Sequence, residues 1–489
     1  MSVVSICLSL LVFGPSRSTM EHVSLAQLLA ATGAEAVGLK CGERGFDSVE
    51  TDSRAVRAGD LFWAIKGQRH DGHDFVEQAL RRGACAAVVQ NTKQTDPQSP
   101  LVIVPNTHEA LWRFARWYRR CRDALVIGVT GSFGKTTTRS MIHAVLSTQF
   151  VGTQSPGNYN NQFGVPLSIL EIDAKHEFAV LEFGASSVGE IRSLAGIAEP
   201  EIGVVTGIGP AHLDGFGDEQ KIVVAKGELV ESLPETGFAV LWGDDLHVRQ
   251  LADRASCRVL FVGENADNDL QATDVQIVKN RLCFTVHNEF FELPTAGRHH
   301  LSAALCAIAI AKEIGLEPAD IAEALQSFRP PPGRCRLEQI GCWTIINDTY
   351  NANPTSMQAA CRHLRDWQTA GRKLLIAGDM LELGTRTAEF HREFGRSAAE
   401  SGIDHLLVHG QQARHVIGGA IERGMPTHRL AECENFDAVL TVLDCWLEPG
   451  DVVLVKGSRA MRMERVVEWL RARQRRQGPS SAVPLRACA

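Results

Sequence analysis

The chain has 489 residues, of which 44% are hydrophobic and 22% are charged, and its formal net charge at pH 7 is -7. This is the composition of a globular protein with room for about three domains, and the acidic balance excludes the basic footprint of a nucleic-acid-binding protein. The 13 cysteines are odd in number and contain no C-x-x-C pair, which favours reduced thiols in the cytoplasm over a disulfide framework or a zinc ribbon.

The N-terminal stretch "VVSICLSLLVFG" is apolar, but it is too short to span a bilayer and no Lys or Arg precedes it. We expect residues 1–19 to be a wrongly assigned start or disordered, with the protein beginning near Met20. A weak signal peptide is the alternative. No other stretch is apolar and long enough to cross a membrane, so no membrane insertion is expected.

Residues 20–105 mix short strands and helices and are predicted to form an N-terminal α/β domain. "VSLAQLLAATG" is an amphipathic helix that Gly33 ends. "VETDSRAVRAGDLFWAIKG" indicates a strand, a turn and a second strand, and "DFVEQALRRGACAAVVQ" a helix followed by a buried strand.

Residues 106–330 are predicted to form a central domain with a parallel sheet. The helix "THEALWRFARWYRRC" leads to the strand "ALVIGVT", and the later strands "FAVLEFG", "IGVVTGI" and "FAVLWGD" alternate with helical stretches. The prolines and glycine of "FRPPPGRC" cannot continue a helix, so we expect a domain boundary there.

Residues 331–474 are predicted to form a second doubly wound domain. Its strands are "TIINDTY", "KLLIAGDM", "HLLVHG" and "DVVLVKGS", and helical stretches separate them. The end of the chain is basic and then rich in Ser and Pro, so residues 475–489 are predicted to be a disordered tail.

The stretch "VTGSFGKTTT" lies between an apolar strand and a helix, the setting of a phosphate-binding loop. Gly131 and Gly134 let the backbone approach phosphate oxygens, and the amides and dipole at the helix start attract the anion. Lys135 is expected to reach the β- and γ-phosphates, and the Thr136 hydroxyl to bind Mg²⁺. The alternative is a Gly-Ser turn with a solvated lysine. The usual pattern G-x-x-x-x-G-K-[ST] requires glycine where this chain has Val129.

Three further residues follow apolar strands or lie in a predicted helix. Glu182 ends a strand, where open α/β sheets present ligands and where a carboxylate could hold Mg²⁺ beside Thr136. A surface glutamate is an equal alternative. His212 follows a constrained G-x-G-P turn, and Lys226 lies in a helix fourteen residues later. A structural histidine and a solvated lysine are the alternatives for these two.

Five segments resemble those of the Mur ligases, in the same order and across about residues 22–470. They are "TGSFGKTTT", "GNYNNQFGVPLSIL", "LEFGAS", "GIGPAHLDGFGDEQKIVVAKGE" and "INDTYNANPTSM". Mur ligases join an amino acid or peptide to the muramoyl-peptide precursor of the bacterial cell wall. Their phosphate loop has the form T-G-[ST]-x-G-K-T-[TS], which accounts for Val129.

The resemblance implies an α/β fold of three domains: an N-terminal UDP-binding domain, a central P-loop ATPase-like domain with a parallel sheet, and a C-terminal Rossmann-like domain. The segments "ETDSRAVRAGDLFWAIKGQRHDGHDF" and "AGDMLELG" are most similar to the branch that adds D-alanyl-D-alanine to UDP-N-acetylmuramoyl tripeptide. The D-N-P-R motif of the diaminopimelate-adding branch is absent from the sequence.

The family's site residues carry over to matching positions. The triphosphate of ATP would lie against the loop, one Mg²⁺ against Thr136 and Glu182, and a second against His212 and Lys226. In many members of the family the lysine that matches Lys226 is carbamylated by CO₂, which makes chemical sense because a carbamate is an oxygen ligand whereas an ammonium repels Mg²⁺. Whether Lys226 carries this carbamate is left open by the sequence. The residues implied are Gly131, Ser132, Phe133, Gly134, Lys135, Thr136 and Thr137 in the loop, Arg334 and Asp348 closing over the nucleotide, and Asp52, Ser53 and Arg54 at the UDP group.

Two departures from the family pattern bear on the nucleotide. Phe133 stands where the family has Asn, Ser or Cys, and its side chain is expected to point away from the phosphates. His300 and Ala303 stand where two asparagines are expected to face the adenine, which leaves the base contacts open.

The resemblance implies an ATP-dependent amide ligase that works through an acyl phosphate, as a cytoplasmic monomer. Its substrates would be UDP-muramoyl tripeptide and D-Ala-D-Ala. The alternatives are another Mur-type or folylpolyglutamate-type ligase, a non-catalytic nucleotide-binding scaffold, and a P-loop phosphatase switch.

Overall fold

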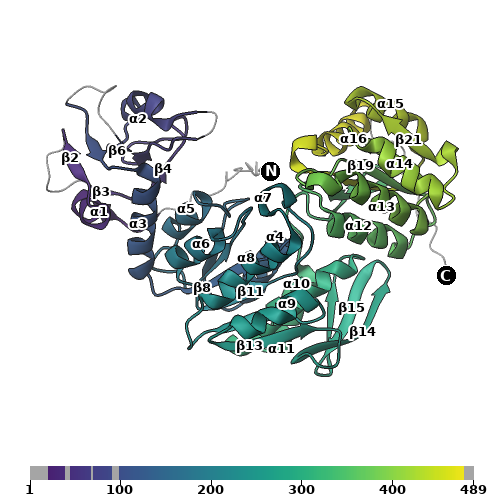
Figure 1. Cartoon of the computed structure of the whole chain (residues 1–489), viewed down its shortest axis with the longest axis horizontal. Helices are drawn as coiled ribbons and strands as arrows, with labels where there is room; N and C mark the ends of the chain where they lie inside the picture. Colours follow the sequence, from purple (N-terminus) through teal and green to yellow (C-terminus); the bar gives the residue numbers. More distant parts are fainter. Residues whose placement is uncertain (1–19, 39–44, 68–69, 91–97, 478–489) are drawn as a thin grey trace, which may run out of the picture. The chain divides into compact units, whose positions relative to one another are not determined.

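The structure is a computed structural model that describes residues 20–38, 45–67, 70–90 and 98–477. The chain divides into two compact units, the first of residues 1–123 and 166–174 and the second of residues 124–165 and 175–489 (Figure 1). Within the described ranges no helix combines the length and apolar character needed to cross a bilayer. The predictions for residues 1–19 and 478–489 lie outside the described residues.

The first unit is built on a five-stranded sheet of order β2-β7-β6-β5-β4, in which β2 is antiparallel to β7 and the other pairs are parallel. The predicted helix that Gly33 ends, and the predicted strand-turn-strand and helix-strand segments, are present. The elements are β1 (Val23–Ser24), α1 (Leu25–Thr32), β2 (Glu35–Val37), β3 (Gly45–Phe46), β4 (Val49–Glu50), β5 (Leu61–Trp63), η1 (Gly72–Phe75), α2 (Val76–Arg81), β6 (Ala86–Val89), β7 (Leu101–Ile103) and α3 (Thr107–Arg120).

The second unit begins with a nine-stranded sheet of order β16-β15-β14-β13-β12-β11-β8-β10-β9. Neighbours from β9 to β14 are parallel, as predicted. The elements are β8 (Leu125–Thr130), α4 (Lys135–Leu146), β9 (Gly152–Gln154), α5 (Gly164–Leu170), β10 (Phe178–Glu182), α6 (Glu190–Ala198), β11 (Ile202–Val205), α7 (Leu213–Phe216), α8 (Glu219–Glu231), β12 (Phe238–Trp242), α9 (Leu246–Arg249), η2 (Gln250–Arg254), β13 (Arg258–Gly263), β14 (Leu270–Val278), β15 (Arg281–Val286), β16 (Glu289–Leu293), η3 (Arg298–His300), α10 (Leu301–Ile314) and α11 (Pro318–Ser327).

The strands β14, β15 and β16 pair antiparallel and extend this sheet, which the sequence reasoning did not anticipate (Figure 1). Their buried residues join the same core as α4 and α10. Helix α10 is almost entirely buried and rich in alanine, as expected of a helix that packs on several sides. Its small side chains allow close approach to α4, the helix that begins at the phosphate loop.

A second sheet in this unit has the order β17-β18-β22-β19-β20-β21, with β17 antiparallel to β18 and the other pairs parallel. Its four predicted strands are present as β18, β19, β20 and β22. The elements are β17 (Arg336–Ile340), β18 (Trp343–Asp348), α12 (Pro354–Asp366), β19 (Lys373–Gly378), η4 (Gly384–Arg386), α13 (Thr387–Glu400), β20 (His405–His409), α14 (Ala413–Glu422), η5 (Thr427–Arg429), β21 (Leu430–Cys433), α15 (Phe436–Trp446), β22 (Val452–Lys456), η6 (Arg459–Met461) and α16 (Glu464–Gln477).

The prediction of a disordered tail from residue 475 is wrong for its first residues, because α16 continues to Gln477. The helix is anchored by Arg473, whose guanidinium lies 5.2 Å from the Trp343 ring centroid and pairs with Asp444 at 2.9 Å. The basic composition of this stretch predicts disorder, whereas in the structure the contacts of Arg473 hold the end of α16 against Trp343 and Asp444.

Candidate active site

The predicted phosphate loop joins β8 to α4, at the carboxyl edge of the parallel strands. Gly131 has φ of 148°, and a Cβ there would lie 2.1 Å from the Thr206 hydroxyl oxygen, so only glycine fits. The Ser132 amide donates to the Gly207 carbonyl at 2.8 Å, which ties the loop to the end of β11. The start of α4 therefore presents an anion cradle of backbone amides.

Lys135 is the first residue of α4, and its Nζ donates to the Gly131 carbonyl across the loop at 2.7 Å. Burial lowers the pKa of Lys135, while the charge of Glu182 acts in the opposite direction. A cation in this position can exchange its carbonyl partner for phosphate oxygens. Thr136 and Thr137 follow it in the first turn of the helix.

The ring of Phe133 lies against Gly207, where an added Cβ would lie 2.4 Å from the ring. The Thr206 hydroxyl donates to the Phe133 carbonyl, which fixes the backbone at this residue. The aromatic side chain thus packs on the glycine turn that follows β11. This position suits the expectation that the ring is directed away from the phosphates.

Glu182 is buried at the end of β10, beside the loop, because β10 pairs with β8 in parallel and Glu182 is in register with Val129. One of its oxygens accepts from Arg139 Nη1 at 3.2 Å and the other from Asn160 Nδ2 at 2.8 Å. The surface alternative for Glu182 is therefore excluded. Its carboxylate is held in place, with lone pairs left for a cation.

Lys226 lies in α8 with 2% of its surface exposed, so the solvated-lysine alternative is wrong. Burial lowers its pKa to about 7, with the charge of Lys135 acting in the same direction. Its Nζ lies 5.6 Å from the centroid of the Phe216 ring. A buried lysine with this pKa is partly a neutral, nucleophilic amine at neutral pH.

His212 adopts a left-handed conformation with φ of 53°, directly before α7. Its Nδ1 pairs with a Glu382 carboxylate oxygen that comes from the loop after β19. Burial lowers the pKa of His212, followed by the charge of Lys135. Lys135 and Lys226 both act on the ring electrostatically, so the loop, His212 and Lys226 share one region of the sheet edge.

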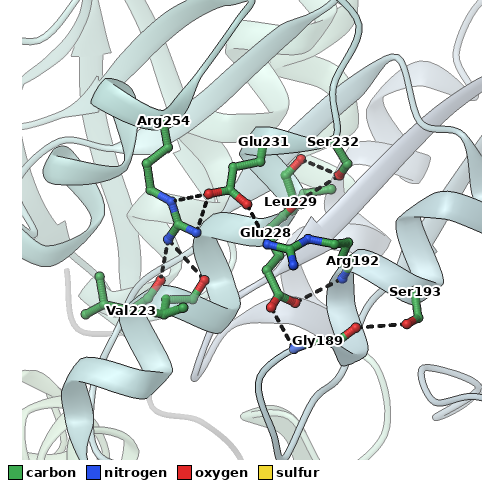
Figure 2. A network of polar contacts seen from close by, with 10 residues as sticks. Gly189, Arg192, Ser193, Val223, Glu228, Leu229, Glu231, Ser232 and Arg254 are labelled. Carbon is green, nitrogen blue, oxygen red and sulfur yellow. Dashed lines mark hydrogen bonds and ion pairs between the residues drawn. The ribbon is translucent and has the colours of Figure 1, made fainter.

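A network of polar contacts on α8 fixes the neighbouring loop (Figure 2). The fully buried Glu228 accepts the amide of Gly189 at 2.6 Å with one oxygen and that of Arg192 at 3.0 Å with the other. These amides belong to the start of α6, so the carboxylate caps that helix. Arg254 and Arg192 share Glu231 on the same helix, as Figure 2 shows.

Arg334 and Asp348 lie in the segment from the proline-rich boundary to the end of β18. Arg334 Nη2 donates to the Thr136 hydroxyl at 3.2 Å, and its guanidinium lies 3.9 Å from the Tyr350 ring centroid. Asp348 is buried and binds Lys456 Nζ at 2.6 Å. The structure brings Arg334 to the phosphate loop, whereas it gives Asp348 a lysine partner of its own.

A cavity of about 890 Å³ opens beside Thr136. Its volume is that of a small-molecule site. Arginine side chains make its lining cationic, and polar residues of the loop after β9 complete it. The lining includes Arg139, Arg334, Tyr350, Arg459 and Gln154. The chemistry of this lining suits carboxylate or phosphate groups.

The predicted UDP contacts lie in the first unit, in the turn after β4. Arg54 binds the Asp52 carboxylate with Nη2 at 2.7 Å and Nε at 2.9 Å, and this pairing lowers the pKa of Asp52 to about 2. The Ser53 hydroxyl donates to Gln78 Oε1 at 2.8 Å. Arg54 is exposed and available to an anionic group.

The two residues that replace the expected asparagines lie at the start of α10. His300 is buried, its Nδ1 lies 3.4 Å from the Thr295 hydroxyl, and burial lowers its pKa to about 4. Ala303 is buried in the helix. A neutral imidazole with one occupied nitrogen keeps at most one free polar atom for a ligand.

Three residues at the site were not singled out from the sequence. Arg139 pairs with Glu182 in the core, Glu382 reaches His212, and Glu228 caps α6. A usable signal existed for Arg139, which follows Lys135 by one helical turn and must lie on the same face. No local pattern marks Glu382 or Glu228, because their partners are distant in sequence.

Comparisons with known proteins agree along the chain. Three family models match: "Mur ligase family, catalytic domain" over residues 46–119, "Mur ligase middle domain" over 129–311, and "Mur ligase, glutamate ligase domain" over 333–459. The chain is 36% identical over 427 residues to UDP-N-acetylmuramoyl-tripeptide–D-alanyl-D-alanine ligase of Bacillus subtilis, covering 86% of this chain and 92% of that one.

Solved structures give the same result. The crystal structure of MurF from Acinetobacter baumannii superposes with a TM-score of 0.84 at 31% identity, covering 93% of this chain and 99% of that one. MurF ligase from Thermotoga maritima, in complex with ADP, gives a TM-score of 0.77 at 30% identity, covering 88% of this chain and 98% of that one. By the identity and coverage of these relatives, the chain belongs to the Mur ligase family.

Proposed function

We propose that the protein is an ATP-dependent amide ligase that adds D-alanyl-D-alanine to UDP-N-acetylmuramoyl tripeptide in the synthesis of peptidoglycan precursor. The observation that carries the proposal is the buried Lys226, with its pKa lowered to about 7, on the same sheet edge as the phosphate loop. A nucleotide-binding loop alone would suit many enzymes. A buried reactive amine beside it suits a ligase of this family.

The loop residues Gly131–Thr137 would hold the triphosphate of ATP through their amides, with Lys135 offsetting the charge of the terminal phosphates. Arg334, now bonded to Thr136, would contact the same phosphates from the opposite side. Asp348, which binds Lys456 Nζ and accepts the Cys335 amide, would act with Arg334 in closing over the nucleotide.

The residues assigned to magnesium fit that ion on the chemistry of their donors. Thr136 and the immobilised Glu182 offer oxygen atoms, which Mg²⁺ prefers. An ammonium at Lys226 would not fit, but a carbamate formed from its neutral amine and CO₂ would, with His212 beside it. The ions, when bound, would neutralise negative charge on the phosphates and the attacking carboxylate.

The reaction would proceed in two steps. The free carboxylate of the tripeptide attacks the γ-phosphorus, the bond to ADP breaks, and an acyl phosphate forms. The neutral amine of D-Ala-D-Ala then attacks the acyl carbon, inorganic phosphate leaves, and the amine nitrogen loses a proton. Lys135 and the loop amides hold the phosphates in line, and proximity supplies much of the acceleration.

The cavity beside Thr136 would hold the reacting ends of the substrates. Its arginines, Arg139, Arg334 and Arg459, suit the carboxylates of the tripeptide and of D-Ala-D-Ala. In the first unit, Asp52, Ser53 and Arg54 would bind the UDP group of the precursor.

One assay tests the function against its alternatives. Phosphate release from ATP is measured with UDP-muramoyl tripeptide, with and without D-Ala-D-Ala, and the product is identified by mass. Phosphate release that requires both substrates supports the proposal. Release supported instead by diaminopimelate or glutamate would indicate another amide ligase, and nucleotide binding without release under any condition would indicate a scaffold.

We further propose that the enzyme works as a monomer in the cytoplasm. The ten cysteines within the described residues are all free thiols, which suits a reducing compartment. Light scattering of the purified protein tests the monomer, and fractionation of cells tests the compartment. A stable dimer in solution would contradict the first part.

A further inference from the structure

A cluster of nitrogen and sulfur side chains lies between the start of α10 and the segment that follows Arg334. His299 and His300 of η3 and Cys335, which precedes β17, each offer one ligand atom, and these atoms all lie within 4.8 Å of one another. The Cys335 Sγ lies 3.4 Å from His299 Nε2, and the two imidazole rings have centroids 4.3 Å apart.

The spacing within this cluster is that of ligands around one metal ion. In a tetrahedral zinc site, a Zn–S bond of about 2.3 Å and a Zn–N bond of about 2.05 Å place sulfur and nitrogen about 3.5 Å apart. The distance between Cys335 Sγ and His299 Nε2, 3.4 Å, agrees with this value within a tolerance of about 0.2 Å. No rearrangement of this pair is needed to admit an ion.

A third imidazole supplies an independent observation. His363 of α12 is 1% exposed, and among the described residues neither of its ring nitrogens has a hydrogen-bond partner. Its ring lies 5.8 Å from that of His299 in an edge-to-face arrangement. A buried polar atom without a partner destabilises the folded state, so the two nitrogens of His363 require an explanation.

The backbone of Cys335 is the second unusual feature. It has φ of 53°, a left-handed conformation that is unfavourable for a non-glycine residue. Its amide donates to Asp348 Oδ1 at 3.1 Å, and Asp348 is in turn held by Lys456. Strain that the surroundings maintain in this way often marks a functional position.

We propose that His299, His300 and Cys335 form a binding site for Zn²⁺, beside the buried and unpartnered imidazole of His363. Imidazole and thiolate donors select zinc over Mg²⁺, which prefers oxygen, so the site is chemically distinct from the proposed magnesium sites. The bound ion would join η3, at the start of α10, to β17 of the six-stranded sheet. This goes beyond the proposed ligase function and does not depend on it.

The test uses full-length protein without a polyhistidine tag, freed of metal by a chelator and titrated with Co²⁺. Cobalt bound by sulfur gives a charge-transfer absorption in the near ultraviolet, together with ligand-field bands in the visible. We expect both, saturating at one equivalent, and their loss when Zn²⁺ is added. Absence of the charge-transfer band from the wild-type protein would overturn the proposal.

Variants then locate the ion. Cys335→Ser should abolish the charge-transfer band, and His299→Ala, at an exposed residue, should weaken Zn²⁺ binding by about tenfold or more. Cys342→Ser and His428→Asn, at exposed positions outside the cluster, should leave the charge-transfer band and the affinity for Zn²⁺ unchanged. Circular dichroism verifies that each variant is folded. A band that persists in Cys335→Ser would place the metal elsewhere and refute the site.

Since no nucleotide or UDP substrate enters this titration, its outcome is separate from that of the ligase assay.

Discussion

Lys135 is half-buried, and its Nζ donates to the Gly131 carbonyl inside the phosphate loop. Lys135→Ala removes the cation that would face the terminal phosphates, so we expect kcat to fall by about 10²–10³-fold or more. Binding of the UDP precursor should persist, because its proposed contacts at Asp52 and Arg54 lie in the first unit. Phosphate release and calorimetry with the precursor measure the two effects. Near-normal turnover would remove the loop from the mechanism.

Lys226 is the residue whose environment differs most from that of a surface lysine. Its pKa of about 7 lies below the ordinary 10.5, so the neutral amine that reacts with CO₂ declines as pH falls through 7. We expect activity in CO₂-depleted buffer to drop as pH falls from about 8 to 6, with bicarbonate restoring it most effectively at the upper end. Activity against pH, with and without bicarbonate, measures this.

The matching substitution is Lys226→Ala, which should be inactive, with partial rescue by short-chain carboxylates that replace the carbamate oxygens. Lys221→Ala is its control, because Lys221 lies on the same helix and pairs only with Asp218 in an exposed position. Full activity of Lys226→Ala would refute the carbamate, and equal loss in Lys221→Ala would show that the helix, not the carbamate, is being damaged.

At the scale of elements, α8 contributes to the site through both of its buried charged residues. Lys226 is the proposed carbamate residue of the site, and Glu228 caps α6 through two backbone amides (Figure 2). Glu228→Gln keeps one acceptor oxygen but places an NH₂ group against an amide donor. We expect the free energy of unfolding to fall by about 1–3 kcal/mol in urea denaturation. Glu235→Gln, at an exposed position, is the control and should change it by less than about 0.5 kcal/mol.

A fall in activity without a fall in stability would contradict a capping role for Glu228.

Most elements could be predicted because their signals are local. The strand before the phosphate loop is a continuous apolar run, and α1 ends at a glycine in the left-handed conformation, as its sequence predicts. The antiparallel extension of the sheet by β14, β15 and β16 could not be predicted. Hydrophobic and polar residues alternate only weakly along β14, and its polar residues face outward. The end of α16 could not be predicted from local sequence either, because the helix is held there by contacts of Arg473 with Trp343 and Asp444, which are remote in sequence.

In the candidate site, too, some residues could be predicted from local sequence and others could not. Lys135, Thr136 and Glu182 could be placed from the sequence, because parallel strands bring their carboxyl ends to one edge. Their partners could not be placed. Glu182 is held by Arg139 and Asn160, and such choices depend on three-dimensional packing rather than on spacing. The family resemblance gave roles to residues but no information on which side chains hold them.

At the scale of the whole molecule, the second unit brings the phosphate loop into contact with the segment that follows the proline-rich boundary. Arg334 donates to Thr136, Asn353 Nδ2 donates to the Ser132 carbonyl at 3.3 Å, and Glu382 pairs with His212. Each contact joins an element of the nine-stranded sheet to one of the six-stranded sheet. Binding of a triphosphate at the loop would therefore affect residues beside both sheets.

Arg334 is the contact that tests this coupling most directly. Arg334→Ala removes a charged donor to the phosphates and the stacking on Tyr350, so we expect kcat/KM for ATP to fall by about 10–100-fold, corresponding to about 1.5–3 kcal/mol. The fall should appear mainly in kcat if Arg334 acts on the transition state, and mainly in KM if it only holds the nucleotide. Arg336→Ala is the matched control, because Arg336 is exposed on the edge strand β17 two residues later. Arg334→Lys should recover little, since a lysine keeps the charge but not the planar donors that stack and bind at once. Steady-state kinetics of the three variants decide the matter: equal rates for Arg334→Ala and the wild type would mean that the six-stranded sheet takes no part in handling ATP.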